Sequence, residues 1–162
     1  LAQGKNSSLH FDFGADFSWH NLRFDGNNTV AATNNTVSFP EVLNAEGRPT
    51  ELSKSKLVIP HVNRTLMPTL RFSKTLITHV SAGVYGGYRL GGYTKTKLAA
   101  SDKKDHNRQN YYLTTFRTGL AAEVGIKNFV DLFVNYDLTP VFQNTSEVKA
   151  PSVRMVSFGI RL

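Results

Sequence analysis

Alternation of apolar and polar residues is the feature of this sequence that most constrains its fold. From residue 9 to residue 20 the odd positions are apolar and the even positions are polar or small: Leu9, Phe11, Phe13, Ala15, Phe17 and Trp19 against His10, Asp12, Gly14, Asp16, Ser18 and His20. Successive side chains of a β-strand point to opposite faces of its sheet. This period of two predicts a strand with one apolar face and one polar face.

The same alternation recurs along the rest of the chain. It predicts further strands over residues 56–72, 76–90, 111–126, 130–139 and 153–162. Pro60 and Pro68 weaken the prediction for 56–72, because each proline removes a backbone donor from the ladder. No segment predicts a helix, and no low-complexity run divides the chain. The sequence therefore indicates a single all-β domain over residues 1–162, with six antiparallel strands visible.

Composition excludes several classes of protein and leaves a membrane location open. Apolar residues make up 40% of the chain and the mean hydropathy is -0.28, so its apolar runs fall short of the roughly 18 residues of a membrane-spanning helix. A strand of a membrane barrel needs only about 9–11 alternating residues. The absence of cysteine excludes disulfides, thiolate metal sites and cysteine nucleophiles.

The predicted connections alternate between long and short. Residues 25–54, 94–110 and 140–152 form long polar connections, whereas 73–75 and 127–128 form tight turns. Outer-membrane barrels of Gram-negative bacteria have short periplasmic turns and long external loops. This pattern predicts a transmembrane up-and-down barrel with a periplasmic C-terminus and an outward-facing basic loop that contains Lys95, Lys97, Lys103, Lys104 and Arg108.

Periodicity alone cannot tell a membrane barrel from a soluble barrel or sandwich, whose apolar face points inward. Three features favour the membrane: the polar faces lack dense lysine, they are rich in small residues, and aromatic residues lie near strand ends. The lipid-facing side chains are then predicted to be Phe11, Phe13, Phe17, Trp19, Leu120, Val134, Phe158 and Ile160. The predicted interior charge network consists of Asp12, Asp16, Arg71, Arg89, Arg117, Glu123, Asp131, Asp137 and Arg161.

Several segments resemble the PorT-like family of outer-membrane barrels, which is common in Bacteroidota. They are residues 136–142 (YDLTPVF), 157–162 (SFGIRL), 83–92 (GVYGGYRLGG) and 16–25. The resemblance implies an eight-stranded barrel in the bacterial outer membrane. It also implies that Val156, Phe158, Ile160 and Leu162 form the terminal signal for barrel assembly, although a terminal leucine departs from the more usual phenylalanine.

Eight implied strands exceed the six visible ones. We therefore expect a hairpin before Leu1 that this chain lacks or that another chain supplies, since six strands would make an implausibly tight closed barrel. Residues 27–40 are interpreted as extensions of an external hairpin rather than as a missing strand.

The sequence contains only weak candidates for metal-binding, catalytic or phosphate-binding sites. His10 and His20 are ten residues apart, roughly 33 Å along an extended strand, so they cannot share one metal ion. Asp16, Ser18 and His20 lie on one face and could in principle form a hydrolytic site, but alternation often produces such triplets. No phosphate-binding loop precedes a helix, and the basic loop with its tyrosines indicates solvation or lipopolysaccharide contact more than nucleic acid.

The expected function is that of a non-catalytic barrel that needs no cofactor or metal. It would act as a structural or accessory subunit of a larger outer-membrane assembly, with outer-membrane lipid, lipopolysaccharide and other outer-membrane proteins as its partners. The alternative is a small stand-alone barrel that binds lipid or another ligand through its basic external loops. A barrel enzyme is the least favoured class.

Overall fold

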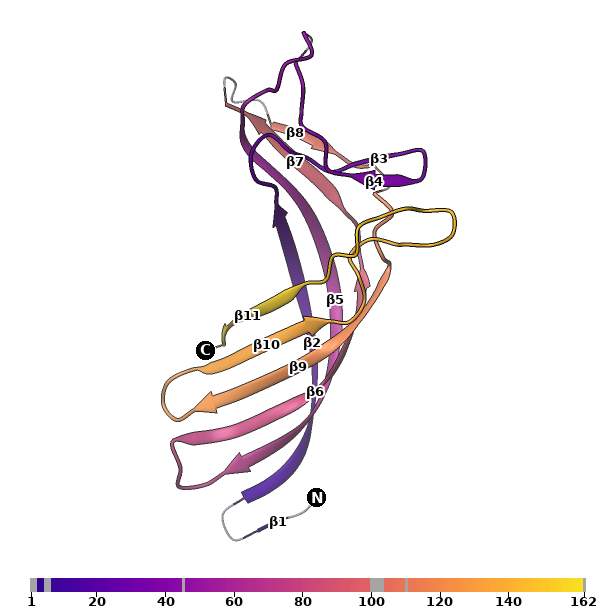
Figure 1. Cartoon of the computed structure of the whole chain (residues 1–162). Helices are drawn as coiled ribbons and strands as arrows, with labels where there is room; N and C mark the ends of the chain where they lie inside the picture. Colours follow the sequence, from indigo (N-terminus) through magenta and orange to yellow (C-terminus); the bar gives the residue numbers. More distant parts are fainter. Residues whose placement is uncertain (1–2, 5–6, 45, 100–103, 110, 162) are drawn as a thin grey trace.

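The chain is an antiparallel β-structure in a computed structural model, which describes residues 3–4, 7–44, 46–99, 104–109 and 111–161. Six long strands follow one another across the main sheet, each antiparallel to the next (Figure 1). They are β2 (Ser7–Arg23), β5 (Leu52–Phe72), β6 (Ile77–Arg89), β9 (Phe116–Ile126), β10 (Asp131–Asp137) and β11 (Val156–Arg161). The predicted all-β antiparallel architecture is confirmed.

Further strands lie outside these six. β1 (Gln3–Gly4) pairs with the start of β2, while β7 (Tyr93–Leu98) pairs with β5 and with β8 (Lys104–Asn107). β3 (Ala31–Thr33) and β4 (Thr36–Ser38) form a separate hairpin. The prediction that residues 25–54 and 94–110 are polar loops was therefore wrong in part, because short strands without clear alternation lie within them.

The main sheet does not close on itself. Among the described residues, the outer side of β2 pairs only with β1, at Ser7 and Ser8, and β11 pairs only with β10. The closed eight-stranded barrel that the sequence predicted is thus not formed by the residues that the structure describes. What they form is an open sheet with β2 near one edge and β11 at the other.

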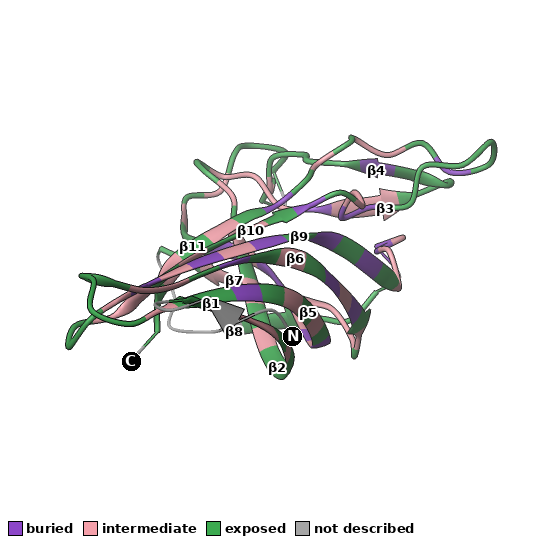
Figure 2. Cartoon of the chain, turned by 90° about the horizontal axis from the view of Figure 1, so that it is seen from below, coloured by how far each residue is buried: buried purple, intermediate pink, exposed green. Residues whose placement is uncertain are grey.

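The sheet is nevertheless strongly curved. Arg117 Nη1 on β9 lies 2.9 Å from His20 Nε2 on β2, although β6 and β5 separate these two strands. In a flat sheet, strands three places apart are roughly 14 Å from each other. The polar face must therefore be the concave one, and Figure 2 shows exposed segments alternating with buried and intermediate ones along β6 and β9.

Both prolines of β5 lie where the hydrogen-bond ladder changes. Pro60 lies between Val58, which pairs with β7, and His61, which pairs with β6. Pro68 and its neighbour Met67 are missing from the otherwise regular β5–β6 register. Proline lacks a backbone donor, so it is tolerated at such interruptions. The predicted strand is real and even longer than expected, since it begins at Leu52.

Glycine allows a close approach at one of these interruptions. A Cβ atom added to Gly83 of β6 would overlap the backbone oxygen of Leu66. Real Cβ atoms essentially never come within 3.0 Å of another heavy atom in this way. Glycine therefore permits the contact between β5 and β6 beside Pro68.

The tight turns form where they were predicted. Lys74 (φ 78) lies between β5 and β6, and Asn128 (φ 57) lies between β9 and β10. The β3–β4 hairpin turns through Asn34 (φ 48) and Asn35 (φ 57), and two successive positive φ angles are typical of a type I′ turn. Asparagine adopts this backbone region more readily than most residues.

The long connections pack together rather than remaining open. Their apolar side chains cover one end of the sheet around the inner residues Leu57 and Ile59 of β5. The other buried members of this cluster are Val30, Val37, Tyr111, Leu113, Val141, Phe142 and Met155. This loop core corrects the view that residues 25–54 and 140–152 are merely polar. The predicted strand over 111–126 also begins later than expected, because Tyr112 has a positive φ of 50° and β9 starts at Phe116.

Candidate functional site

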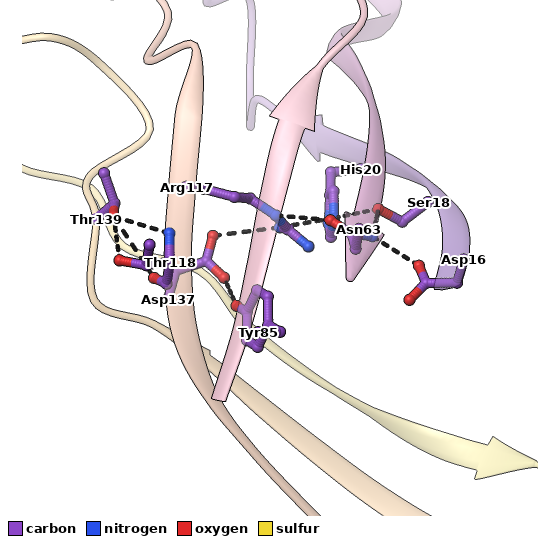
Figure 3. A network of polar contacts seen from close by, with 9 residues as sticks. All are labelled: Asp16, Ser18, His20, Asn63, Tyr85, Arg117, Thr118, Asp137 and Thr139. Atoms are coloured by element: carbon purple, nitrogen blue, oxygen red, sulfur yellow. Dashed lines mark hydrogen bonds and ion pairs between the residues drawn. The ribbon is translucent and has the colours of Figure 1, made fainter. Parts of the chain in front are cut away.

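Arg117 is the centre of a polar network on the concave face (Figure 3). Its Nη1 atom lies 3.3 Å from Asp137 Oδ2, and the side chains of these two residues are only 7% and 4% exposed. Asp137 also accepts a hydrogen bond from the hydroxyl of Tyr85, whose ring lies 5.1 Å from the Arg117 guanidinium carbon. Because a buried charge is costly without a partner, these contacts offset the cost of burying the two charged groups.

The network continues from Arg117 to the opposite side of the sheet. Asn63 on β5 accepts a hydrogen bond from Arg117 Nε (3.3 Å) and donates to Asp16 Oδ1 (2.6 Å) and to Ser18 Oγ (3.0 Å). The network thus joins β2, β5, β6, β9 and β10 by side chains alone. Such links between non-adjacent strands exist only because the sheet curls around its polar face.

The geometry around His20 does not reproduce a catalytic triad. Ser18 Oγ lies 3.1 Å from His20 Nε2, as a nucleophile and a base would. Arginine has no acceptor, so the 2.9 Å contact from Arg117 requires the same Nε2 atom to accept a hydrogen bond. The carboxylate of Asp16 is bonded to Asn63 rather than to the ring. The third group of a triad normally orients the base through its other nitrogen, and Asp16 does not do so here.

A second polar group lies near the tight turns. Glu123 on β9 forms an ion pair with Arg161 of β11, and its Oε1 atom lies 3.2 Å from His79 Nε2. Asp131 Oδ2 lies 4.0 Å from the same histidine nitrogen. His79, Glu123 and Asp131 are spaced closely enough to hold a divalent cation, but Arg161 already holds the other oxygen of Glu123. Within this group Glu123 has the closest contacts, to Arg161 and to His79.

The predicted interior charges therefore fall into separate groups rather than one network. Asp16, Arg117 and Asp137 meet in the first, and Glu123, Asp131 and Arg161 meet in the second. Asp12 and Arg71 form a more exposed pair, with 3.5 Å between their charged atoms and side chains that are 41% and 55% exposed. Arg89 bonds instead to the backbone oxygen of Thr114.

Sequence reasoning missed the uncharged members of these groups. Asn63, Tyr85, His20 and His79 bridge the charges, yet only charged residues were predicted as the network. A signal was present, because all four lie on the polar side of their alternating segments. Neutral residues on a polar face become relevant once that face is concave, since each buried charge then needs several hydrogen-bond partners.

The convex face exposes the apolar side chains. The eight predicted lipid-facing residues are exposed, from 44% for Val134 to 83% for Phe158. In the predicted assembly signal Val156, Phe158 and Ile160 are exposed on the edge strand β11, while Leu162 lies outside the described residues. Arg64 is a charged exception on this face, where it is paired in register with Ala15 on one side and Gly86 on the other.

The predicted basic loop is mostly strand. Lys95 and Lys97 lie on β7 and Lys104 lies on β8, whereas Arg108 follows β8 and Lys103 lies outside the described residues. The register places these strands beside further basic residues of β5, which the sequence prediction did not associate with them. Lys56 is opposite Lys95, and Lys54 is opposite Lys97.

Comparison with known protein families, with characterised proteins and with solved structures finds no significant match to this chain. Within the described part of the chain, no helix has the length and apolar character needed to cross a membrane.

Proposed function

We propose that this chain is a non-catalytic, integral outer-membrane β-barrel polypeptide of the PorT-like type, which acts as a structural or accessory subunit of a larger assembly. The observation that carries the proposal is the orientation of the sheet. Its convex face exposes apolar residues along every long strand, while its concave face contains the paired charges. A soluble protein rarely exposes an apolar surface of this extent.

The dimensions of the apolar face fit a bilayer. On β2 the exposed or half-exposed apolar residues run from Leu9 to Trp19. This span matches the roughly 9–11 residues that a tilted barrel strand uses to cross a membrane. Trp19, which is 63% exposed, lies at the end of the span, where interfacial aromatic residues concentrate.

Closure of the barrel is part of the proposal. β2 and β11 run in opposite directions, so an even number of added strands would join them by antiparallel pairing. Two further strands give a total of about eight, the size at which side chains just fill the interior. β1 already pairs with the free side of β2, and a longer strand in its place would cover that edge.

Arg64 favours an accessory role over a stand-alone barrel. An arginine that faces lipid at the bilayer midplane costs about 2–4 kcal/mol of folding free energy. The small neighbours Ala15 and Gly86 leave space above the sheet around this side chain. A partner protein that covers Arg64 with a carboxylate or backbone oxygens would remove this cost.

Purification tests the proposal. The protein should be recovered from outer membranes only with detergent, in a stoichiometric complex whose members mass spectrometry identifies. The Arg64→Leu variant should lose the partner while its isolated barrel becomes more stable. As a matched control, Leu66→Ala on the same face should retain the partner. A chain that is soluble without detergent would contradict the membrane location, and a complex unaffected by Arg64→Leu would contradict the assigned contact.

A further inference from the structure

The convex face changes character along β2 and β5 toward the long connections. On β2 the face is apolar from Leu9 through Phe17 to Trp19, and it ends with Asn21 and Arg23. On β5 the positions of the same face run from Pro60 through Val58, which is buried, to Lys56 and Lys54. Apolar residues and then cationic residues thus follow one another on the same side of both strands.

The strand register brings the cations of three strands together. Arg23 of β2 is opposite Lys56 of β5, and Lys56 is in turn opposite Lys95 of β7. The aromatic ring of Tyr93, two residues before Lys95, lies on the same face and is 5.7 Å from the ring of His106. We define the cationic row as Arg23, Lys54, Lys56 and Lys95.

Like charges that face each other across a sheet destabilise it. Within the described residues no carboxylate lies at ion-pair distance from a member of the cationic row. Asp105 of β8 is opposite Thr96, whose side chain alternates to the other face from that of Lys95. The amine of Lys56 donates instead to the neutral Asn21 Oδ1, at 2.6 Å.

The mutual repulsion is reflected in the titration of one member. The pKa of Lys56 is lowered, first by partial desolvation and then by the charges of Lys54, Lys95 and Arg23. A bound anion would relieve both the repulsion and this shift. The chain therefore presents a concentrated positive charge for which the described residues offer no counter-charge.

We propose that the cationic row binds the phosphate groups of lipid head groups in the leaflet on the side of the long connections. The inference rests on the proposed outer-membrane location, which places the row directly beyond the aromatic residues that mark the bilayer interface. Lysine and arginine at this depth are attracted to anionic head groups. The spacing along three strands suits a lipid that carries more than one phosphate.

Native mass spectrometry of the detergent-purified protein tests this site with diphosphorylated lipid A as the probe. The triple variant Lys54→Gln, Lys56→Gln, Lys95→Gln should bind this lipid at least about tenfold more weakly than the wild-type protein. Removing one of the two phosphates from the lipid should weaken its binding to the wild-type protein more than to the triple variant. Equal binding by the wild-type and triple-variant proteins would overturn the proposal.

A second triple variant controls for net charge. Lys74, Lys127 and Lys149 are exposed and lie outside the cationic row, so changing them to glutamine removes the same number of charges. This variant should keep at least half of the wild-type affinity for the lipid. A loss of affinity equal to that of the first variant would show that net charge alone explains the effect, which would overturn the proposed site. Displacement of the lipid by inorganic phosphate alone would show that the site takes a soluble anion, which would also overturn the proposal.

The same preparations distinguish a failure of the proposed phosphate site from a failure of the proposed membrane barrel. A protein that needs detergent for extraction and migrates differently on gels before and after heating supports the membrane barrel, whether or not it binds lipid A. If that behaviour holds while the triple variant binds normally, only the phosphate site fails. If the unmodified protein is soluble, the proposed function itself fails.

Discussion

Charged side chains on the two faces of the sheet have opposite surroundings. On the concave face Arg117 reaches partners on three other strands, and its ion pair with Asp137 is almost completely buried. On the convex face Lys54, Lys56 and Lys95 are close to one another and have no carboxylate partner among the described residues. Curvature explains the difference, because it makes inward-pointing side chains converge and outward-pointing ones diverge. Side-chain contacts between non-adjacent strands can therefore form only on the inner face.

The largest expected effect follows from breaking the buried pair. Arg117→Met should lower the free energy of unfolding by about 3–5 kcal/mol, because it leaves Asp137 buried without a cation. The measurement is urea unfolding of the protein folded in detergent or lipid vesicles. Arg71→Met is the matched control, since it breaks the exposed pair with Asp12 and should cost about 0–1 kcal/mol. Equal losses in the two variants would show that the Arg117 network is not buried.

A smaller loss of stability is expected when a larger side chain replaces Gly83 on the crowded inner face. Gly83→Ala should cost about 1–3 kcal/mol, because the new methyl group collides with the backbone of β5 at Leu66 and Met67. Gly14→Ala is the control, since its Cβ would be 3.7 Å from Thr65 Cβ, an ordinary contact. Unfolding measurements on both variants check the difference. A Gly83→Ala protein as stable as the Gly14→Ala protein would mean that β5 and β6 do not approach as closely as the structure indicates.

The smallest effect should have the opposite sign. Lys56→Gln removes repulsion from Lys54, Lys95 and Arg23, so it should raise the free energy of unfolding by about 0.2–1 kcal/mol in a neutral detergent. High salt should abolish the gain, because it screens exposed charges. In anionic lipid the variant should lose this advantage. A destabilised Lys56→Gln protein in neutral detergent at low salt would show that the cationic row is internally satisfied after all.

Much of the fold could be predicted from the sequence, because a β-strand is the regular structure whose side chains change face at every residue. All six long strands were anticipated, although Pro60 and Pro68 argued against the second. The sequence could not show that β5 tolerates these prolines. Pro60, for example, is tolerated because it lies where the strand partner of β5 changes from β7 to β6. The strands β7 and β8 were missed because their lysines and other polar residues resemble a solvated loop.

The candidate sites could be predicted only in part. Arg117 and Asp137 were assigned to the same interior, but their pairing depends on a register that periodicity does not contain. Asn63 was overlooked because its place on the polar face does not tell which three charged or polar side chains surround it. The same limit applied to Lys56, whose place beside Lys95 follows from pairing between distant segments.

The sequence by itself determined which side chains share a face, because the pleat of a strand sends neighbours to opposite sides whatever the rest of the chain does. Only the tertiary structure decided which face is concave, since an apolar face can line a soluble core or surround a polar interior with the same alternation. Curvature and register then selected the partners: Arg117 with Asp137 inside, and Lys56 with Lys95 outside. These choices depend on distances between strands that are far apart in the chain, and local patterns carry no information about them.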